Sequence, residues 1–203
     1  VYKLPIKACP CSTNTSMFGT YCDNGDESKC MHMLNDNIIR DSIDLSYTDR
    51  HDETFLIKCC KMRMNNVCEK ILEYPFECNI GKKDKRGNTA MMCAIVNELR
   101  SVCEKIIKYG HICGLNDATY NTRLFEQACG NNMELVAMKL LKYPTEPCTI
   151  NPTKHYMNFM YACKNKMEKL CLKMLDNVEF PIIYNEYPER HDVIMLYGNV
   201  LLL

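Results

Sequence analysis

One short segment returns along this chain at a nearly constant interval. The clearest copies are Val-Cys-Glu-Lys-Ile-Leu-Glu-Tyr at 67–74 and Val-Cys-Glu-Lys-Ile-Ile-Lys-Tyr at 102–109, which lie 35 residues apart. Related segments follow at 135–143 and 170–175, each a further 34 residues along when the apolar positions are aligned. A repeat of this length is one supersecondary unit that cannot bury its own apolar face, so neighbouring copies must stack. The repeat therefore predicts a solenoid, a class of protein that usually binds partners.

Each copy of the repeat predicts two short helices separated by a polar break. Apolar residues recur at i, i+3 and i+4 in both segments of a copy, as expected for helices with one buried face. The breaks lie at 61–64, 96–99, 130–133 and 164–167. We expect a left-handed backbone at the third position of the break, where Asn132 tolerates that geometry, and an apolar plug at the fourth. After each second helix, a polar loop marked by Pro or Gly leads to the next copy.

Residues 49–181 resemble the ankyrin repeat. The best match is Asp-Lys-Arg-Gly-Asn-Thr-Ala-Met at 84–91 together with the helix and Gly at 102–110. These segments follow the family's Asp-x-x-Gly-x-Thr start and its second helix ending in two aliphatic residues and Gly. The family's Thr-Pro-Leu-His tetrapeptide is altered at 54–57 and 89–92, and it is lost at 123–126. The resemblance implies an all-α ankyrin-repeat solenoid of helix-turn-helix units joined by projecting loops.

We divide the chain along this repeat. A shift of 38 residues lays 16–18 on 54–56, which extends the pattern towards the N-terminus. Residues 193–199 align with 159–165, which predicts a truncated copy, with more repeats or a capping unit beyond it in the native protein. The expected segments are an N-terminal extension at 1–11, a divergent repeat at 12–48 that ends in a long finger, ankyrin repeats at 49–83, 84–117, 118–151 and 152–186, and a partial repeat at 187–203.

Cysteine is unusually abundant, at 15 of 203 residues. Many of these cysteines fall at helical positions where other copies carry Ala, Ile, Val or Leu. Free cysteine behaves as a small apolar side chain, so we interpret them as core residues of a protein in a reducing compartment. The alternative is a zinc site built from Cys9, Cys11, Cys22, Cys30 and His32. We rank it second because the spacing is not Cys-x-x-Cys and because Cys22 and Cys30 fall on core positions of the repeat.

Charge and motif content argue against several other functions. Lys plus Arg and Asp plus Glu number 25 each, so no global field attracts nucleic acid or an anionic membrane. The only basic cluster, at 82–86, lacks interleaved aromatic residues and is interpreted as a solvated turn tip. No segment has the length and apolarity of a membrane span, and residues 1–10 lack the apolar core of a signal peptide. The five His residues fall mostly in loops, and neither a Cys-His-Asp constellation nor a Gly-rich phosphate loop is present. We therefore predict no enzyme activity, no catalytic residue, and no metal or cofactor.

The ankyrin resemblance also implies where a partner would bind. In that family, the loop tips and the exposed face of the first helices line a concave groove. Tyr120 and Tyr156 are the expected anchors, because Tyr is enriched among the residues that dominate interface energies. The expected partner-binding residues are Arg50, His51, Glu53 and Lys61 in the first copy, Lys85, Arg86 and Asn88 (with Val96) in the second, Thr119, Tyr120 and Thr122 (with Gly130) in the third, and Thr153, Lys154, Tyr156 and Lys164 in the fourth.

The sequence as a whole predicts a non-enzymatic adaptor or scaffold that binds a protein partner. The alternative is a structural subunit of a larger assembly, such as a virus particle. Asn and Lys are abundant and Trp is absent, a composition that an AT-rich coding sequence would produce. Together with the degenerate repeats, this composition is similar to that of the ankyrin proteins of large DNA viruses or of AT-rich protists. We accordingly expect a cytoplasmic location, in the host cytoplasm or the virion for a viral protein.

Overall fold

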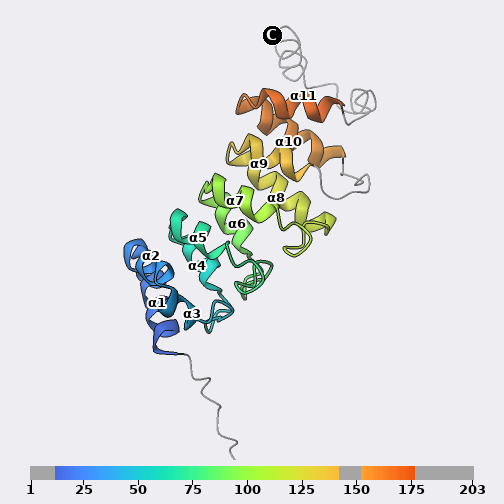
Figure 1. The fold of residues 1–203 in the computed structure, drawn as a ribbon. Coiled ribbons are helices and arrows are strands. Elements are labelled where there is room, and N and C mark those ends of the chain that lie inside the picture. Colours follow the sequence, from blue (N-terminus) through green and yellow to red (C-terminus); the bar gives the residue numbers. More distant parts are fainter. Residues whose placement is uncertain (1–11, 142–151, 177–203) are drawn as a thin grey trace, which may run out of the picture. The chain divides into compact units, whose positions relative to one another are not determined.

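The computed structural model describes residues 12–141 and 152–176, and these residues are all-α (Figure 1). They form eleven helices, and their only β-type pairing is one isolated bridge between Thr48 and Thr54. Ten of the helices form five consecutive pairs. The first helices of the pairs are α1 (Thr13–Asn24), α4 (Phe55–Lys61), α6 (Ala90–Val96), α8 (Ala118–Gly130) and α10 (Pro152–Lys164). The second helices are α2 (Glu27–Asn35), α5 (Asn65–Ile71), α7 (Arg100–Ile107), α9 (Glu134–Leu140) and α11 (Glu168–Asp176), and the remaining helix is α3 (Asn37–Asp41).

The break inside each pair has the left-handed residue that the sequence predicts. Its φ angle is 54° at Asn132, and the equivalent residues of the other pairs are Gly25 (66°), Arg63 (58°), Glu98 (58°) and Lys166 (54°). The following residue then donates its N–H to a carbonyl five residues earlier, as from Met64 to Cys59 at 3.0 Å and from Met133 to Ala128 at 2.9 Å. This arrangement is the Schellman motif, which satisfies the last carbonyls of a helix and ends it. A backbone device shared by all five pairs therefore sets the turn between their helices.

The fourth position of the break is buried, as predicted. Met64, Met133 and Met167 are each at most 2% exposed, and Leu99 is 8% exposed. An apolar residue at this point of a Schellman motif packs back on the helix that it follows. The twelve cysteines in the described residues are also buried, and all are free thiols. This confirms the prediction that they are core residues.

The chain divides into two compact units, the first ending at Cys93 and the second beginning at Ala94. In the first unit, α1 packs against α2 and α4, and α5 packs against α2 and α4. In the second unit, α8 packs against α9 and α10, and α9 packs against α7 and α11. Within each unit, first helices thus lie against first helices and second helices against second helices. This is the neighbour-to-neighbour packing through which a repeat buries its apolar face.

The first helices begin in two different ways. The helices α4 and α6 are each seven residues long and follow a tight turn, whereas α8 has thirteen residues and starts directly from Asp117, whose side chain accepts the N–H of Tyr120 at 2.9 Å. The sequence alignment placed a loop tip at 119–122, and the structure corrects this, because those residues form the first turns of α8. The reason is local. The Asp, Gly and Thr of the turn are replaced by Ala118, Asn121 and Arg123 in this copy.

Candidate binding surface

The turns before α4 and α6 are built in the same way. The carboxylate of Asp49 accepts the N–H groups of His51 (2.8 Å) and Glu53 (3.0 Å). That of Asp84 accepts the N–H groups of Arg86 (2.9 Å) and Asn88 (2.8 Å). An Asp side chain that bonds to the backbone two residues ahead is a standard turn-forming device. The two Asp residues therefore fix the path of the chain at each turn.

Each turn ends on a threonine that starts the following helix. Thr54 accepts the N–H of Ile57, and Thr89 accepts that of Met92, both at 3.2 Å. A threonine in this position satisfies one of the N–H groups left open at a helix N-terminus. The fourth residue of the turn has positive φ in both copies, 59° at Asp52 and 79° at Gly87. We call residues 49–54 the first turn and residues 84–89 the second turn.

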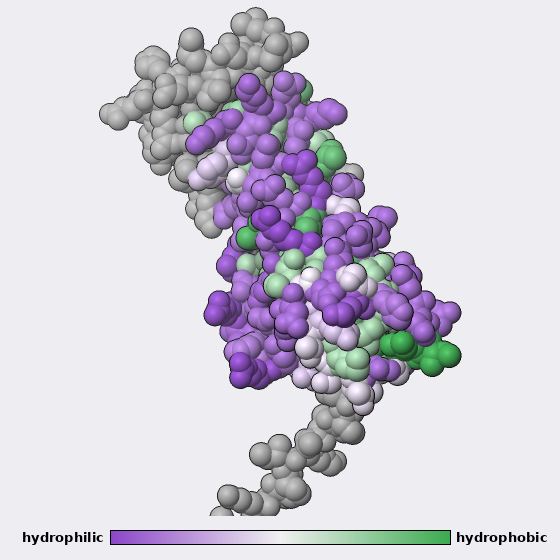
Figure 2. Space-filling view, turned by 90° about the vertical axis from the view of Figure 1, so that its left-hand side faces the viewer, coloured by the Kyte–Doolittle hydropathy of each residue, from purple (hydrophilic) through white to green (hydrophobic). Residues whose placement is uncertain are grey.

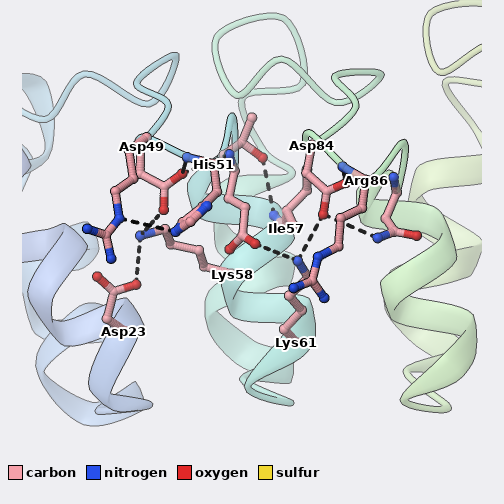
Figure 3. Close-up of polar contacts among 12 residues, drawn as sticks. Asp23, Asp49, His51, Ile57, Lys58, Lys61, Asp84 and Arg86 are labelled. Carbon is pink, nitrogen blue, oxygen red and sulfur yellow. Dashed lines mark hydrogen bonds and ion pairs between the residues drawn. The ribbon is translucent and has the colours of Figure 1, made fainter.

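Two lysines of α4 pair with the acidic residues of the turns (Figure 3). The Nζ of Lys58 lies 2.6 Å from Asp23 and 3.0 Å from Asp49, and its side chain is only 7% exposed. The Nζ of Lys61 lies 2.7 Å from Glu53 and 3.0 Å from Asp84. Each turn-forming Asp is thus neutralised by a lysine of one helix. Because a buried carboxylate is tolerated only when it is paired and hydrogen-bonded, these lysines are part of the fold.

These contacts keep the pairs ionised. Burial alone would raise the pKa of Asp84, but the backbone N–H of Asn88 and the ammonium of Lys61 outweigh it and hold that pKa below its usual range. The pKa of Asp49 is lowered against the same opposing effect of burial, by the N–H of Glu53 and by Lys58. Burial opposes the charge of Lys61 as well, yet Glu53 and Asp84 raise its pKa. All three groups are therefore charged near neutral pH.

The two turns are joined through the backbone. The N–H of Lys85 donates to the carbonyl of His51 at 3.0 Å. The side chains of Arg50, His51, Lys85 and Arg86 remain exposed, and we call these four residues the basic tips. Within the basic tips, Arg50 Nε donates to His51 Nε2 at 3.1 Å. Asp49, Glu53 and Asp84 are held in ion pairs with Lys58 and Lys61, so the exposed ends of these turns are predominantly basic.

The other residues predicted for the first two copies are engaged in the fold. Glu53 and Lys61 form the ion pair described above, and Asn88 Nδ2 donates to Asp84 at 3.3 Å. The sequence analysis missed Asp23, Asp49, Lys58 and Asp84, which hold the turns in place. The recurrence of Asp at the start of both turns was the available signal. Lys58 gave none, because the same position holds Cys93 in the next copy.

The residues predicted for the third and fourth copies lie on helices. Thr119 is exposed, whereas the Thr122 hydroxyl donates to the carbonyl of Ala118 at 2.8 Å. Tyr120 is only 9% exposed, so its ring belongs to the core of its unit and is not available as the anchor that we expected. Lys164, with Val96 and Gly130, is exposed. Thr153, Lys154 and Tyr156 lie on α10, and their side chains fall outside the described residues.

Hydrophilic side chains cover most of the face drawn in Figure 2, and strongly hydrophobic ones occur there as small separate areas. The large apolar side chains that are well exposed come from different helices and loops, among them Ile38 of α3, Phe76 and Leu135.

In the part of the chain that is described, no group of three or more His, Cys, Asp or Glu residues is arranged to hold a metal ion. Cys9 and Cys11 of the alternative zinc site lie outside that part.

Neither a protein-family model nor a curated protein matches this chain. None of the helices in 12–141 and 152–176 has the length and apolarity needed to cross a membrane. The class that the fold defines is therefore an all-α protein of repeated helix pairs.

Proposed function

We propose that this protein is a non-enzymatic binding module, an ankyrin-type solenoid that contacts a protein partner through its basic tips. The observation that carries the proposal is the contrast inside the two turns. Asp49, Glu53 and Asp84 are held in ion pairs with Lys58 and Lys61. The side chains of Arg50, His51, Lys85 and Arg86 are exposed. Rigid backbone with exposed charged ends is what a recognition surface needs, because little side-chain and loop entropy is lost on binding.

The chemistry of the tips favours a partner with an acidic surface. Charge complementarity sets which partners approach and how fast they do so more than it sets total affinity. Because the chain carries equal numbers of acidic and basic residues, attraction would be confined to these tips and would weaken as salt is added. The four basic tips include no Phe, Tyr or Trp, which argues against single-stranded nucleic acid, because it binds by stacking successive bases on such side chains.

Charge reversal at the tips tests this proposal. The test variant carries Arg50→Glu, Lys85→Glu and Arg86→Glu in the full chain. The matched control carries Lys108→Glu, Arg123→Glu and Lys169→Glu, three exposed basic residues at the end of α7, in α8 and in α11. Proteins captured from a source lysate by each variant and by the unmodified chain are quantified by mass spectrometry. We expect a set of acidic proteins that the control retains and the test variant loses. Equal capture by both variants would contradict the proposal, as would a captured fraction made of nucleic acid.

A further inference from the structure

A pair of cysteines spans the two helices in three of the five helix pairs. In each case the residues are eight apart, one near the end of the first helix and one in the second helix. The Sγ–Sγ distances are 3.8 Å for Cys22–Cys30, 3.7 Å for Cys60–Cys68 and 3.5 Å for Cys163–Cys171. All six residues are buried and carry reduced thiols. We call these three arrangements the thiol pairs.

The break between the helices, rather than the cysteines themselves, produces this geometry. The carbonyl of the first cysteine accepts the N–H of the left-handed residue, from Arg63 to Cys60 at 3.3 Å and from Lys166 to Cys163 at 3.0 Å. This bond is the second hydrogen bond of the Schellman motif. It fixes the backbone of the first cysteine at the point where the chain reverses, so any two residues at these positions face each other. The same positions hold Ile95 and Cys103 in the second copy and Cys129 and Ala137 in the third.

We propose that the thiol pairs are oxidation sites, at which a peroxide converts two neighbouring thiols into a disulfide that joins the two helices of one pair. The thiolate of one cysteine attacks a peroxide oxygen and becomes a sulfenic acid as the O–O bond breaks, releasing water once the leaving oxygen is protonated. The thiolate of the second cysteine then attacks the sulfenic sulfur, and the S–S bond forms as a second water leaves. In total, two thiols and hydrogen peroxide yield one disulfide and two waters.

The sulfurs need little movement for this reaction. A disulfide has an S–S distance of about 2.05 Å, and a change of side-chain rotamer can bring two facing sulfurs to it from the distances seen here. Cys129 provides an internal reference, because it is a buried thiol whose opposite position in the helix pair is filled by Ala137. Burial raises the pKa of Cys129 to about 12. This thiol is therefore neutral and has no resolving cysteine across its helix pair.

The Cys163–Cys171 pair should react first. Cys163 is 7% exposed, whereas Cys22, Cys30, Cys60 and Cys68 are 0% exposed. Within this pair, the hydrogen bond from Cys171 lowers the pKa of Cys163, so the more exposed cysteine is also the one that ionises first. Thiol hydrogen bonds lower the pKa of Cys22 and that of Cys68 as well, so exposure and not ionisation separates the three pairs. The fully buried pairs react only when their helices open locally, which makes their oxidation slower. The order of oxidation thus follows directly from burial.

Cys59 offers a competing route in the first unit, since its sulfur lies 3.6 Å from that of Cys22. The equivalent residues in the next three copies are Ala94, Ala128 and Ala162. Cys59→Ala therefore introduces the residue that the repeat itself uses at this position, and it removes the competing thiol with little disturbance of packing. This variant serves as the background for the test.

The test exposes the folded Cys59→Ala chain to hydrogen peroxide, unfolds it, blocks the remaining thiols with iodoacetamide, and maps linked peptides by mass spectrometry. We expect linked peptides for Cys163–Cys171 first and for Cys60–Cys68 and Cys22–Cys30 later, with alkylation lost at all six residues. Cys129 should remain alkylated throughout. A reductant such as dithiothreitol should then restore alkylation at all six thiols, because the sulfurs form disulfides rather than higher oxides.

A constructed fourth pair makes the test independent of the natural thiol pairs. Ala137→Cys places a second thiol opposite Cys129, and we expect a new link between Cys129 and the introduced thiol, so Cys129 loses its alkylation in this variant only. The proposal is overturned if Cys129 stays alkylated in Ala137→Cys while the protein remains helical, or if the thiol pairs oxidise no faster than Cys129 does in the Cys59→Ala background. Links formed only between molecules would overturn it as well. None of these outcomes bears on partner binding by the basic tips.

Discussion

The starts of α6 and α8 differ although both helices open a repeat of the same kind. Before α6, Asp84 gathers two backbone N–H groups, Gly87 supplies a left-handed residue and Thr89 caps the helix. In the third copy, those positions hold Ala118, Asn121 and Arg123, which lie within α8, and Asp117 caps this helix, which is almost twice as long. Three side chains thus decide whether a segment projects as a turn or is absorbed into a helix. In the third copy the segment is helical because it lacks the side chains that would satisfy the backbone N–H groups of the turn.

The largest effect that separates the two starts is expected at Asp84. Its side chain is 1% exposed, accepts two N–H groups and pairs with Lys61. Asp84→Ala should lower the free energy of unfolding by about 2–3 kcal/mol, because two part-buried backbone N–H groups lose their acceptor and Lys61 loses one of its two carboxylate partners. Urea unfolding followed by circular dichroism measures this loss. The control Glu73→Ala removes a surface pair with Lys70, which water and salt screen, so it should leave the urea midpoint nearly unchanged. Equal losses in the two variants would show that Asp84 does not anchor the turn.

Acid should weaken the two turns that Asp49 and Asp84 hold in place. The pKa of Asp84 and that of Asp49 are lower in the folded protein than in the unfolded chain. Their contribution to stability is therefore complete above the unfolded pKa of about 4 and is lost as the pH falls through the lower, folded values. The urea midpoint of unfolding should therefore decrease as the pH is lowered from neutral through this window. The urea midpoint of Asp84→Asn should decrease less steeply with falling pH. If its slope equals that of the unmodified chain, the pKa of Asp84 does not contribute to the pH dependence of stability.

A smaller loss is expected at the cap of α8. Asp117→Ala removes a single accepted N–H, that of Tyr120, and should cost about 1 kcal/mol. Asp117→Asn keeps a side-chain oxygen in place and should lower the free energy of unfolding by only a few tenths of the loss expected for Asp117→Ala. If Asp117→Ala destabilised the protein as much as Asp84→Ala, the two starts would not differ in the way described above.

The smallest effects concern the left-handed residue of each turn. An added Cβ at Gly87 meets no atom within 4 Å, so Gly87→Ala suffers only from its φ of 79° and should cost about 1 kcal/mol. Asp52 occupies the same position at 59°, and Asp52→Gly should gain about 0.5 kcal/mol by relieving the left-handed strain. Matched urea titrations measure the change in the free energy of unfolding for both variants. Changes of opposite sign would confirm that the two turns share one geometry, and changes of the same sign would contradict it.

The parts of the structure that could be predicted are those that the repeat states several times. Asn132 indicated the left-handed break because Asn tolerates that geometry. Met64, Met133 and Met167 indicated a buried position because Met recurs there in three of the four copies. The turn of the third copy was predicted by alignment alone, and the loss of its Asp and Thr allowed the helix to extend over it. Lys58 could not be found, because it is a charged residue in a core position of one copy and its partner Asp23 lies 35 residues earlier in the sequence.

The hydrogen bond from Lys85 N–H to the carbonyl of His51 has a consequence for how such a surface can change over time. The two residues that set the distance between the turns do so with main-chain atoms, while their side chains are exposed. Almost any residue can supply that N–H and that carbonyl. Mutation can therefore change the charges at these positions while the main-chain hydrogen bond between the turns is kept.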